Sequence, residues 1–226
     1  MVQRVFFLLC AFFICHVFLF AQRSSRLNVP QQYRIIQSAV NAARVGDTVL
    51  VDHGLYYENV RINKNIVLAS RFILDRDTAH ISRTIIDGSR PKDIAKGSVV
   101  TIFGGTDTMC VLTGFTVTRG VGTQFLWREG PSAWVYSICG GGVLLLESGA
   151  RISRNVIRNN TVKRTRGWES VWGGALAATN ARFVPSLPLV IIEDNIITDN
   201  TVIGLEAESG GISIYHQSIV RRNAFI

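Results

Sequence analysis

The chain has 226 residues and a formal net charge of +8, made up of 24 basic and 16 acidic residues. This length fits one domain. The surplus of positive charge favours an anionic partner, such as an acidic polysaccharide or a lipopolysaccharide-bearing surface, although it also fits a surface that is merely solvated. The sequence contains no Walker loop, dinucleotide fingerprint or zinc motif, which excludes the nucleotide and zinc chemistries that depend on them.

The first 21 residues have the anatomy of a secretory signal peptide. Arg4 supplies a positive start, residues 5–20 form an apolar run interrupted only by His16, and Ala21 offers a small residue for cleavage. A run of 16 residues is short for a membrane span, which needs about 20. We therefore expect cleavage rather than an uncleaved anchor, a secreted or cell-surface protein (extracellular or periplasmic), no stable membrane span after cleavage, and no nucleic-acid partner.

The signal segment contains Cys10 and Cys15, so the mature chain keeps only Cys110 and Cys139. Two cysteines in an exported protein can form one disulfide bridge. The alternative is that both are small buried residues in separate parts of the fold, and we favour this interpretation.

Residues 22–32 are interpreted as a polar linker that precedes the folded domain. Residues 33–44 carry apolar side chains at helical spacing, and Gly46 follows where a helix should end. Short apolar runs at residues 48–51, 60–62 and 66–68 predict strands, and no further helix is expected after residue 44. A short helix ahead of stacked strands is expected to cap the open edge of the first coil.

The second half of the chain repeats itself. Residues 152–157 and 160–162 reappear as residues 192–197 and 200–202, and looser copies begin at residues 112 and 220. Self-similarity at a period of 20 to 50 residues indicates a solenoid, in which each coil buries its apolar face against its neighbours.

Three asparagines occupy one position of this repeat, namely Asn155, Asn195 and Asn223. Asparagine tolerates a left-handed turn and can bond its amide to the asparagine of the next coil, so we expect a stacked ladder. Glycine pairs recur between the copies, at residues 141–142, 173–174 and 210–211. They fit places where the backbone bends into the next strand.

The opening of this region resembles the opening of right-handed parallel β-helix proteins of the pectin-lyase-like superfamily, pectin methylesterases above all. The resemblance rests on residues 36–39, 46–51 and 54–58, which read IQSA, GDTVLV and GLYYE. The units with glycine pairs and asparagines also resemble the repeats of polymorphic outer-membrane adhesins. The resemblance covers about residues 33–226 and implies an all-β, right-handed parallel β-helix with a short N-terminal capping helix. It does not fix the chemistry, because one fold hosts many functions.

The copies differ mainly in their connections, residues 121–139, 163–172 and 203–209, which should emerge on one flank of the solenoid. Such insertions often form the binding face. The first two connections hold all four tryptophans and several charged side chains, and these are the candidate carbohydrate-binding residues: Trp127, Arg128, Trp134, Arg166, Trp168, Glu169 and Trp172. The tryptophans are expected to stack on sugar rings of a polysaccharide or a cell-surface glycan. The alternative is that they pack together as a minor core under long loops.

Catalysis finds little support in the sequence. A pectate-lyase-like elimination needs carboxylates that hold calcium beside a basic residue, and only Glu193, Asp194 and Asp199 are clustered enough to be weak candidates. The catalytic segments of pectin methylesterases are not recognisable downstream of the opening. We therefore expect a non-catalytic binding protein without a cofactor. The alternatives are a polysaccharide lyase, with calcium, or a hydrolase, and a structural passenger or stalk fragment of an adhesin.

The last copy of the repeat places Asn223 only a few residues before Ile226, inside an apolar strand. Solenoids need a polar cap on their terminal coil. We therefore expect that the domain is incomplete at this end, and that its C-terminal coil needs a partner or further coils.

Overall fold

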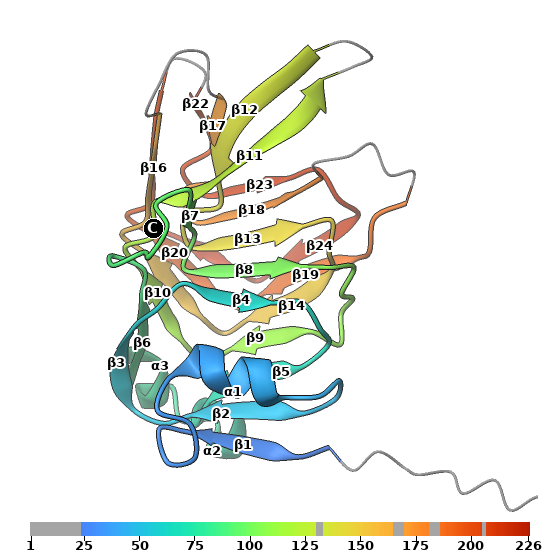
Figure 1. Cartoon of the computed structure of the whole chain (residues 1–226). Helices are drawn as coiled ribbons and strands as arrows, with labels where there is room; N and C mark the ends of the chain where they lie inside the picture. Colours follow the sequence, from blue (N-terminus) through green and yellow to red (C-terminus); the bar gives the residue numbers. More distant parts are fainter. Residues whose placement is uncertain (1–23, 130–132, 165–169, 181–185, 205–206) are drawn as a thin grey trace, which may run out of the picture.

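The computed structural model describes residues 24–129, 133–164, 170–180, 186–204 and 207–226. Residues 1–21, predicted to be a signal peptide, lie outside this part. The described chain is built of short strands stacked into parallel sheets, with the N-terminal coils at one end and the C-terminal coils at the other (Figure 1). It is an all-β solenoid, as the repeat predicts.

Three parallel sheets surround the core. The first has seven strands, in the order β1 (Arg26–Val29), β2 (Thr48–Val51), β5 (Val67–Ser70), β9 (Val111–Thr113), β14 (Ala150–Ser153), β19 (Val190–Glu193) and β24 (Ser218–Arg221). The second has six strands, β3 (Gly54–Tyr57), β6 (Thr84–Asp87), β10 (Thr116–Thr118), β15 (Val156–Arg158), β20 (Ile196–Thr198) and β25 (Ala224–Phe225). The third has five strands, β4 (Val60–Ile62), β8 (Val100–Phe103), β13 (Val143–Leu146), β18 (Leu176–Thr179) and β23 (Ile212–Ile214).

A fourth sheet forms one flank of the solenoid between the second and third sheets. Its five strands are β7 (Lys96–Gly97), β11 (Gly122–Glu129), β12 (Ala133–Cys139), β17 (Ser170–Trp172) and β22 (Ala207–Glu208). A separate pair of parallel strands, β16 (Thr161–Lys163) and β21 (Thr201–Ile203), leads toward it. The chain visits the first, second and third sheets in turn, so each strand pairs with one from the next coil.

The strand register confirms the repeat read from the sequence. Ile152 pairs with Ile192, and Ile192 in turn pairs with Val220. In the second sheet, Ile157 pairs with Ile197. Equivalent residues of successive coils thus lie one above another, because parallel strands stack about 4.8 Å apart.

The stacked strands enclose one apolar core. Leu68, Leu112, Ile152 and Ile192 form one of its columns, and each is fully buried. Burying a side chain of this size contributes about 1.5–3 kcal/mol. Cys110 also lies in this core, and burial raises the pKa of its thiol to about 12. Cys110 and Cys139 are both buried and unbridged, which agrees with the interpretation that we favoured.

The helix predicted at residues 33–44 is present as α1 (Ile36–Ala42), which buries Ile36, Ala39 and Val40 against the first coils. It contacts β1, β2 and β4. The segment interpreted as a polar linker, residues 22–32, contains strand β1. Alternate residues of β1 are buried in the core, and the strand pairs with β2.

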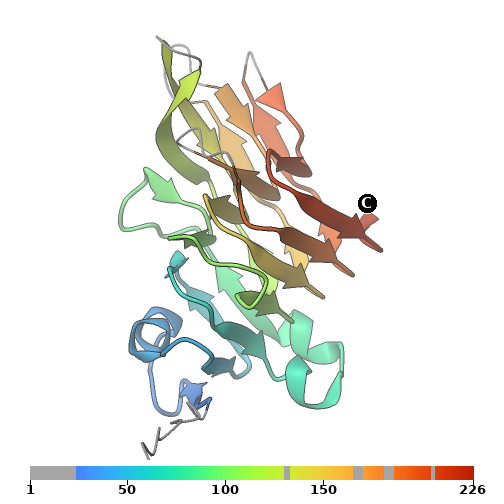
Figure 2. The same ribbon diagram turned by 90° about the vertical axis from the view of Figure 1, so that its right-hand side faces the viewer.

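The expectation that no helix follows residue 44 is wrong. Helices α2 (Phe72–Asp75) and α3 (Ala79–Arg83) form a helical insertion, residues 72–83, between β5 and β6. Figure 2 shows this insertion and α1 on different sides of the first coils. Both helices are too short to show helical periodicity in the sequence. They are held by contacts with β5, β6 and β10.

The asparagine ladder is present. Asn155 Nδ2 donates a hydrogen bond to Asn195 Oδ1 at 3.1 Å, and Asn195 Nδ2 donates to Asn223 Oδ1 at 2.9 Å. The left-handed residues, however, are those just before the asparagines: Arg154, Asp194 and Arg222. Each asparagine instead closes the turn by donating to the carbonyl two residues earlier, as Asn155 does to Ser153 at 3.0 Å. A second ladder joins Asn160 Nδ2 to Asn200 Oδ1 at 2.9 Å.

Glycines form a second column, Gly141, Gly174 and Gly210, at the edge of the third sheet. Gly141 N donates to Gly173 O, and Gly174 N donates to Ser209 O, which fixes this register. Gly141 therefore lies opposite Gly174 and not opposite Gly173, so the glycine pairs at residues 141–142 and 173–174 are shifted by one residue relative to each other. A Cβ atom on Gly141 would lie 2.3 Å from Gly174 O, so the coils approach too closely for a side chain.

Candidate functional site

The connections between the second and third sheets stack on one flank, as the sequence predicts. Strands β12, β17 and β22, from the three connections, pair in parallel. The first connection, predicted as a loop, is a β-hairpin in which β11 and β12 pair antiparallel and project from the solenoid (Figure 1). Its strands are rich in aromatic and β-branched residues, which favour an extended pleated backbone.

Trp172, a predicted sugar-stacking residue, is buried instead. It is 5% exposed and packs with Cys139, Leu144 and Ala177 in a small second core on the outer face of the third sheet. The ring of Phe125 meets it edge-on at a centroid distance of 6.2 Å. Strands β13 and β18 therefore lie between two apolar layers, and their unbroken apolar sequences reflect burial of both faces. Trp172 therefore has a packing role, which agrees with the alternative that the tryptophans form a minor core.

The other candidates on this flank are less fully described. Trp127 and Arg128 lie in β11, and Trp134 lies in β12, with Arg128 opposite Trp134 in the register. Arg166, Trp168 and Glu169 lie outside the described residues. Stacking of these tryptophans on sugar rings stays a prediction.

Glu193, a weak calcium candidate, lies among arginines. Its side chain is 8% exposed and forms ion pairs with Arg151, with Arg221 at 2.7 Å and with Arg222 at 3.3 Å. Burial by itself would raise the pKa of Glu193, but the hydrogen bonds from Arg221 and Arg151 outweigh it and lower the pKa. This carboxylate joins its own coil to the coils on both sides, through Arg151 in β14 and Arg221 in β24.

Asp194 and Asp199 do not join Glu193 in a ligand cluster. Arg222 binds Asp194 through two hydrogen bonds, of 2.6 and 2.9 Å, and Arg154 lies 3.5 Å away. Asp199 accepts a hydrogen bond from the neighbouring Thr198 hydroxyl. Within the described ranges, no three or more histidine, cysteine or acidic side chains are grouped so that they could hold a metal ion.

We expect Glu193→Gln to flatten the acid sensitivity of the fold. Because the pKa of Glu193 is lowered in the folded state, its ion pairs stabilise the protein above the unfolded value of about 4.3. That contribution is lost as the pH falls through the folded-state pKa. Urea unfolding at a series of pH values from 6 to 3 should therefore show a shallower loss of stability in the variant. Asp199→Asn is the matched control and should keep the parental slope; equal slopes in parent and Glu193→Gln would contradict the prediction.

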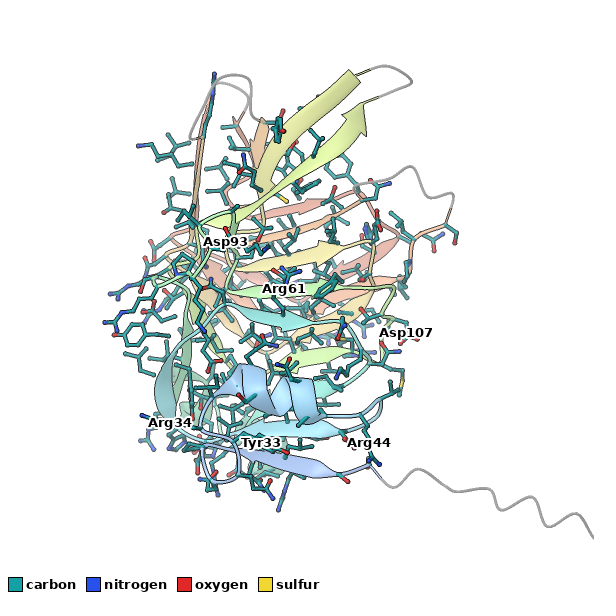
Figure 3. All side chains as sticks on the ribbon, viewed as in Figure 1. Tyr33, Arg34, Arg44, Arg61, Asp93 and Asp107 are labelled. Carbon is teal, nitrogen blue, oxygen red and sulfur yellow. The ribbon has the colours of Figure 1, made fainter. Side chains whose placement is uncertain are left out.

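A basic groove opens beside the first coils, with a volume of about 700 Å³. It lies between α1, strands β3 and β4, and the segment of residues 88–97 that leads to β7. Four of its lining side chains are basic and two are acidic: Arg61, Arg90, Lys92 and Lys96 against Glu58 and Asp93. Figure 3 shows Arg61 on the outer face of the third sheet and Asp93 on the segment beside it.

Two of the arginines in this groove rest on aromatic rings. The guanidinium carbon of Arg90 lies 3.8 Å from the ring centre of Tyr57, and that of Arg61 lies 4.5 Å from the ring centre of Phe103. A guanidinium stacked on a ring keeps its N–H groups free in the plane, where they can bind a carboxylate through two parallel bonds. The rings thus hold two anion-binding groups in fixed places.

Both acidic side chains of the groove already have partners. Glu58 accepts hydrogen bonds from the backbone N–H groups of Ile36 and Gln37, at 2.8 and 2.9 Å, and so holds the start of α1. Asp93 pairs with Lys96 at 2.9 Å, and this hydrogen bond, with one from the backbone of Ala95, lowers the pKa of Asp93. The unpaired charge in the groove is therefore positive.

This groove was not predicted from the sequence. Residues 88–97 connect β6 toward β8 on the same flank as the tryptophan-bearing connections, but they lack a glycine pair and a tryptophan. The signal that could have found them is the local sequence SRPKDIAKG at residues 89–97, which places three basic side chains within nine residues. Arg61 and Phe103 join it only through the stacking of β4 on β8.

Stacked parallel sheets, an internal repeat and an asparagine ladder are compatible with the parallel β-helix that the sequence resembles. Such an architecture hosts many functions. In the described part of the chain, no helix is long and apolar enough to cross a membrane. No protein-family model, no curated protein and no solved structure matches the chain.

Proposed function

We propose that this protein is an exported, right-handed parallel β-helix of the pectin-lyase-like type that binds an acidic carbohydrate chain in the basic groove, without catalysis. The observation that carries the proposal is the pair of ring-supported arginines, Arg90 on Tyr57 and Arg61 on Phe103. The right-handed winding of the coils is supported by the general rule that crossovers between parallel β-strands are right-handed in nearly all proteins. Helix α1 serves as the cap of the first coils and forms one wall of the groove.

An acidic sugar matches the groove in chemistry and size. Uronate residues carry carboxylates on a chain of rings and hydroxyls, and guanidinium groups bind carboxylates through paired hydrogen bonds. Lys92 adds a mobile charge, while Asn59 and Asn63 line the groove with amides that can meet hydroxyls. Ligand sites in proteins commonly occupy about 300–1,000 Å³, a range that includes this groove.

The groove lies next to the flank of stacked connections, where carbohydrate binding was predicted from the sequence. Strand β7, which ends the groove segment, pairs with β11 of the projecting hairpin. A polysaccharide held by Arg61 and Arg90 can therefore extend along the stacked connections toward Trp127 and Trp134. The net charge of +8 supports attraction of such a polyanion to the surface as a whole.

The test is binding to polygalacturonate and to alginate, measured by affinity-gel retardation and calorimetry. The double variant Arg61→Gln, Arg90→Gln should weaken binding at least about tenfold, because hydrogen bonds to charged groups contribute about 1.5–3 kcal/mol and 1.4 kcal/mol is a factor of ten. Neutral polysaccharides such as galactan should bind weakly to the parent.

The matched control is Arg83→Gln, Arg158→Gln, which removes two exposed arginines and changes the net charge equally. It should bind acidic polysaccharide nearly as the parent does. Equal losses in the two double variants would show that only diffuse charge matters and would overturn the groove. Release of unsaturated products from polygalacturonate, dependent on calcium, would overturn the non-catalytic part and favour a lyase.

A further inference from the structure

The helical insertion brings together two histidines that are 27 positions apart in the chain. His53 is exposed in the turn between β2 and β3, and His80 lies in α3 with its side chain 12% exposed. Nε2 of His53 lies 2.6 Å from Nδ1 of His80. On the other side of the His80 ring, Nε2 lies 3.0 Å from the carboxylate of Asp75. The three side chains form a continuous hydrogen-bonded row.

The carboxylate at one end of the row sets the proton positions. An ionised carboxylate only accepts hydrogen bonds, so His80 carries its proton on Nε2, and its Nδ1 directs a lone pair at His53. Metal-binding histidines are commonly oriented in this way, with the second ring nitrogen donating to a carboxylate.

We propose that His53 and His80 bind a divalent transition-metal ion, which replaces the proton between their rings and fastens the helical insertion to the first coils. Two metal–nitrogen bonds of about 2.0–2.1 Å at a tetrahedral angle place the nitrogens roughly 3.3 Å apart. The exposed His53 makes this small adjustment by side-chain rotation. Asp75 positions His80, and water occupies the other coordination positions.

The ligand set determines which ions fit. Two neutral imidazoles suit Cu²⁺, Ni²⁺ and Zn²⁺, and Cu²⁺ binds most tightly in the general order of affinities. Ca²⁺ and Mg²⁺ take oxygen ligands and are not expected here. Asp52, which precedes His53 in the chain, accepts a hydrogen bond from Gln31 at 2.9 Å and pairs with Arg71 at 3.4 Å, and so stays out of the coordination sphere. The site is separate from the basic groove and does not depend on glycan binding.

Calorimetric titration of the full chain with Cu²⁺ and with Zn²⁺ tests the site. We expect saturable binding by one ion per chain, tighter for Cu²⁺, with a rise in melting temperature because the ion binds only the folded arrangement. His53→Gln and His80→Gln should each weaken binding at least about tenfold, and Asp75→Asn should weaken it about 10–100-fold. The Cu²⁺ electron paramagnetic resonance spectrum should show coupling to two imidazole nitrogens in the parent and to one in His53→Gln.

His216→Gln is the matched control, because the His216 ring bonds to backbone groups, with Nε2 lying 3.0 Å from the carbonyl oxygen of Thr179. This variant should bind the ion as the parent does. Since His53 is exposed in a turn, its replacement should leave the circular dichroism spectrum unchanged. Parental affinity in folded His53→Gln, or a parental spectrum with fewer than two nitrogen couplings, would overturn the site.

Discussion

Gly141→Ala is expected to lower the free energy of unfolding by roughly 3–5 kcal/mol, among the largest effects that a single substitution produces. A Cβ atom at this position would lie 2.3 Å from the carbonyl oxygen of Gly174 and 3.0 Å from Cβ of Asn160. The carbonyl belongs to the next coil, and that coil is fixed by ladder hydrogen bonds on both sides. The clash therefore cannot be relieved by rotating a side chain, and the coils must separate. Equilibrium unfolding in urea measures the loss.

Gly211→Ala provides the matched control for this prediction. The nearest atoms to a Cβ on Gly211 belong to the ring of Phe225, at 3.5 and 3.6 Å, which is ordinary contact. Its effect should stay within about 0.5 kcal/mol, as for most surface substitutions. Similar losses for the two variants would mean that glycine is needed for backbone freedom alone, and not for close approach of the coils.

Asn155→Ala is expected to lower the free energy of unfolding by about 2–6 kcal/mol. The Asn155 amide donates to the carbonyls of Leu112 and Ser153 at 3.0 Å each, and its oxygen accepts from the backbone N–H of Phe115 at 3.0 Å. Alanine would leave at least two of these buried backbone groups without a partner, and each such group costs about 1–3 kcal/mol. Thermal and urea unfolding, followed by circular dichroism, measure the change.

Asn41→Ala is the control, an exposed asparagine in α1 whose side chain accepts a hydrogen bond from Gln37 at 2.8 Å. Alanine favours a helix, so this variant should match the parent within about 0.5 kcal/mol. A loss below about 1 kcal/mol for Asn155→Ala would contradict the ladder as a source of stability.

The repeating part of the fold was readable from the sequence for a physical reason. When coils stack in register, the same residue type must fill the same position in each coil, and that requirement leaves a period in the chain. Asn155 and Asn195 show it most clearly, since each amide needs the next. The backbone geometry of the turn was predicted less well. The left-handed residue is Arg154 and not Asn155. Asparagine occupies this turn because its side chain forms hydrogen bonds there, and not because it tolerates a left-handed backbone.

The candidate sites were less readable, because they are built from residues that do not repeat. Trp172 looked available to a ligand in sequence, yet the neighbouring strands supply Leu144 and Ala177 as a surface that buries it. Arg90 and Tyr57 are far apart in the chain and meet only when residues 88–97 fold back beside β3 and β4. Contacts of this kind are not predicted by any pattern in the local sequence.

Three features could be predicted from the amino-acid sequence: the stacked parallel strands, the flank from which the connections emerge, and the ladder of Asn155, Asn195 and Asn223. Those features follow from the repeat in the sequence and from pairing between like residues of successive coils. The contacts between distant side chains were visible only in the folded chain: the ring-supported arginines of the basic groove, the burial of Trp172, and the contact of His53 with His80. Each depends on how one irregular segment packs against a regular coil, and that packing is set by the whole surface it covers.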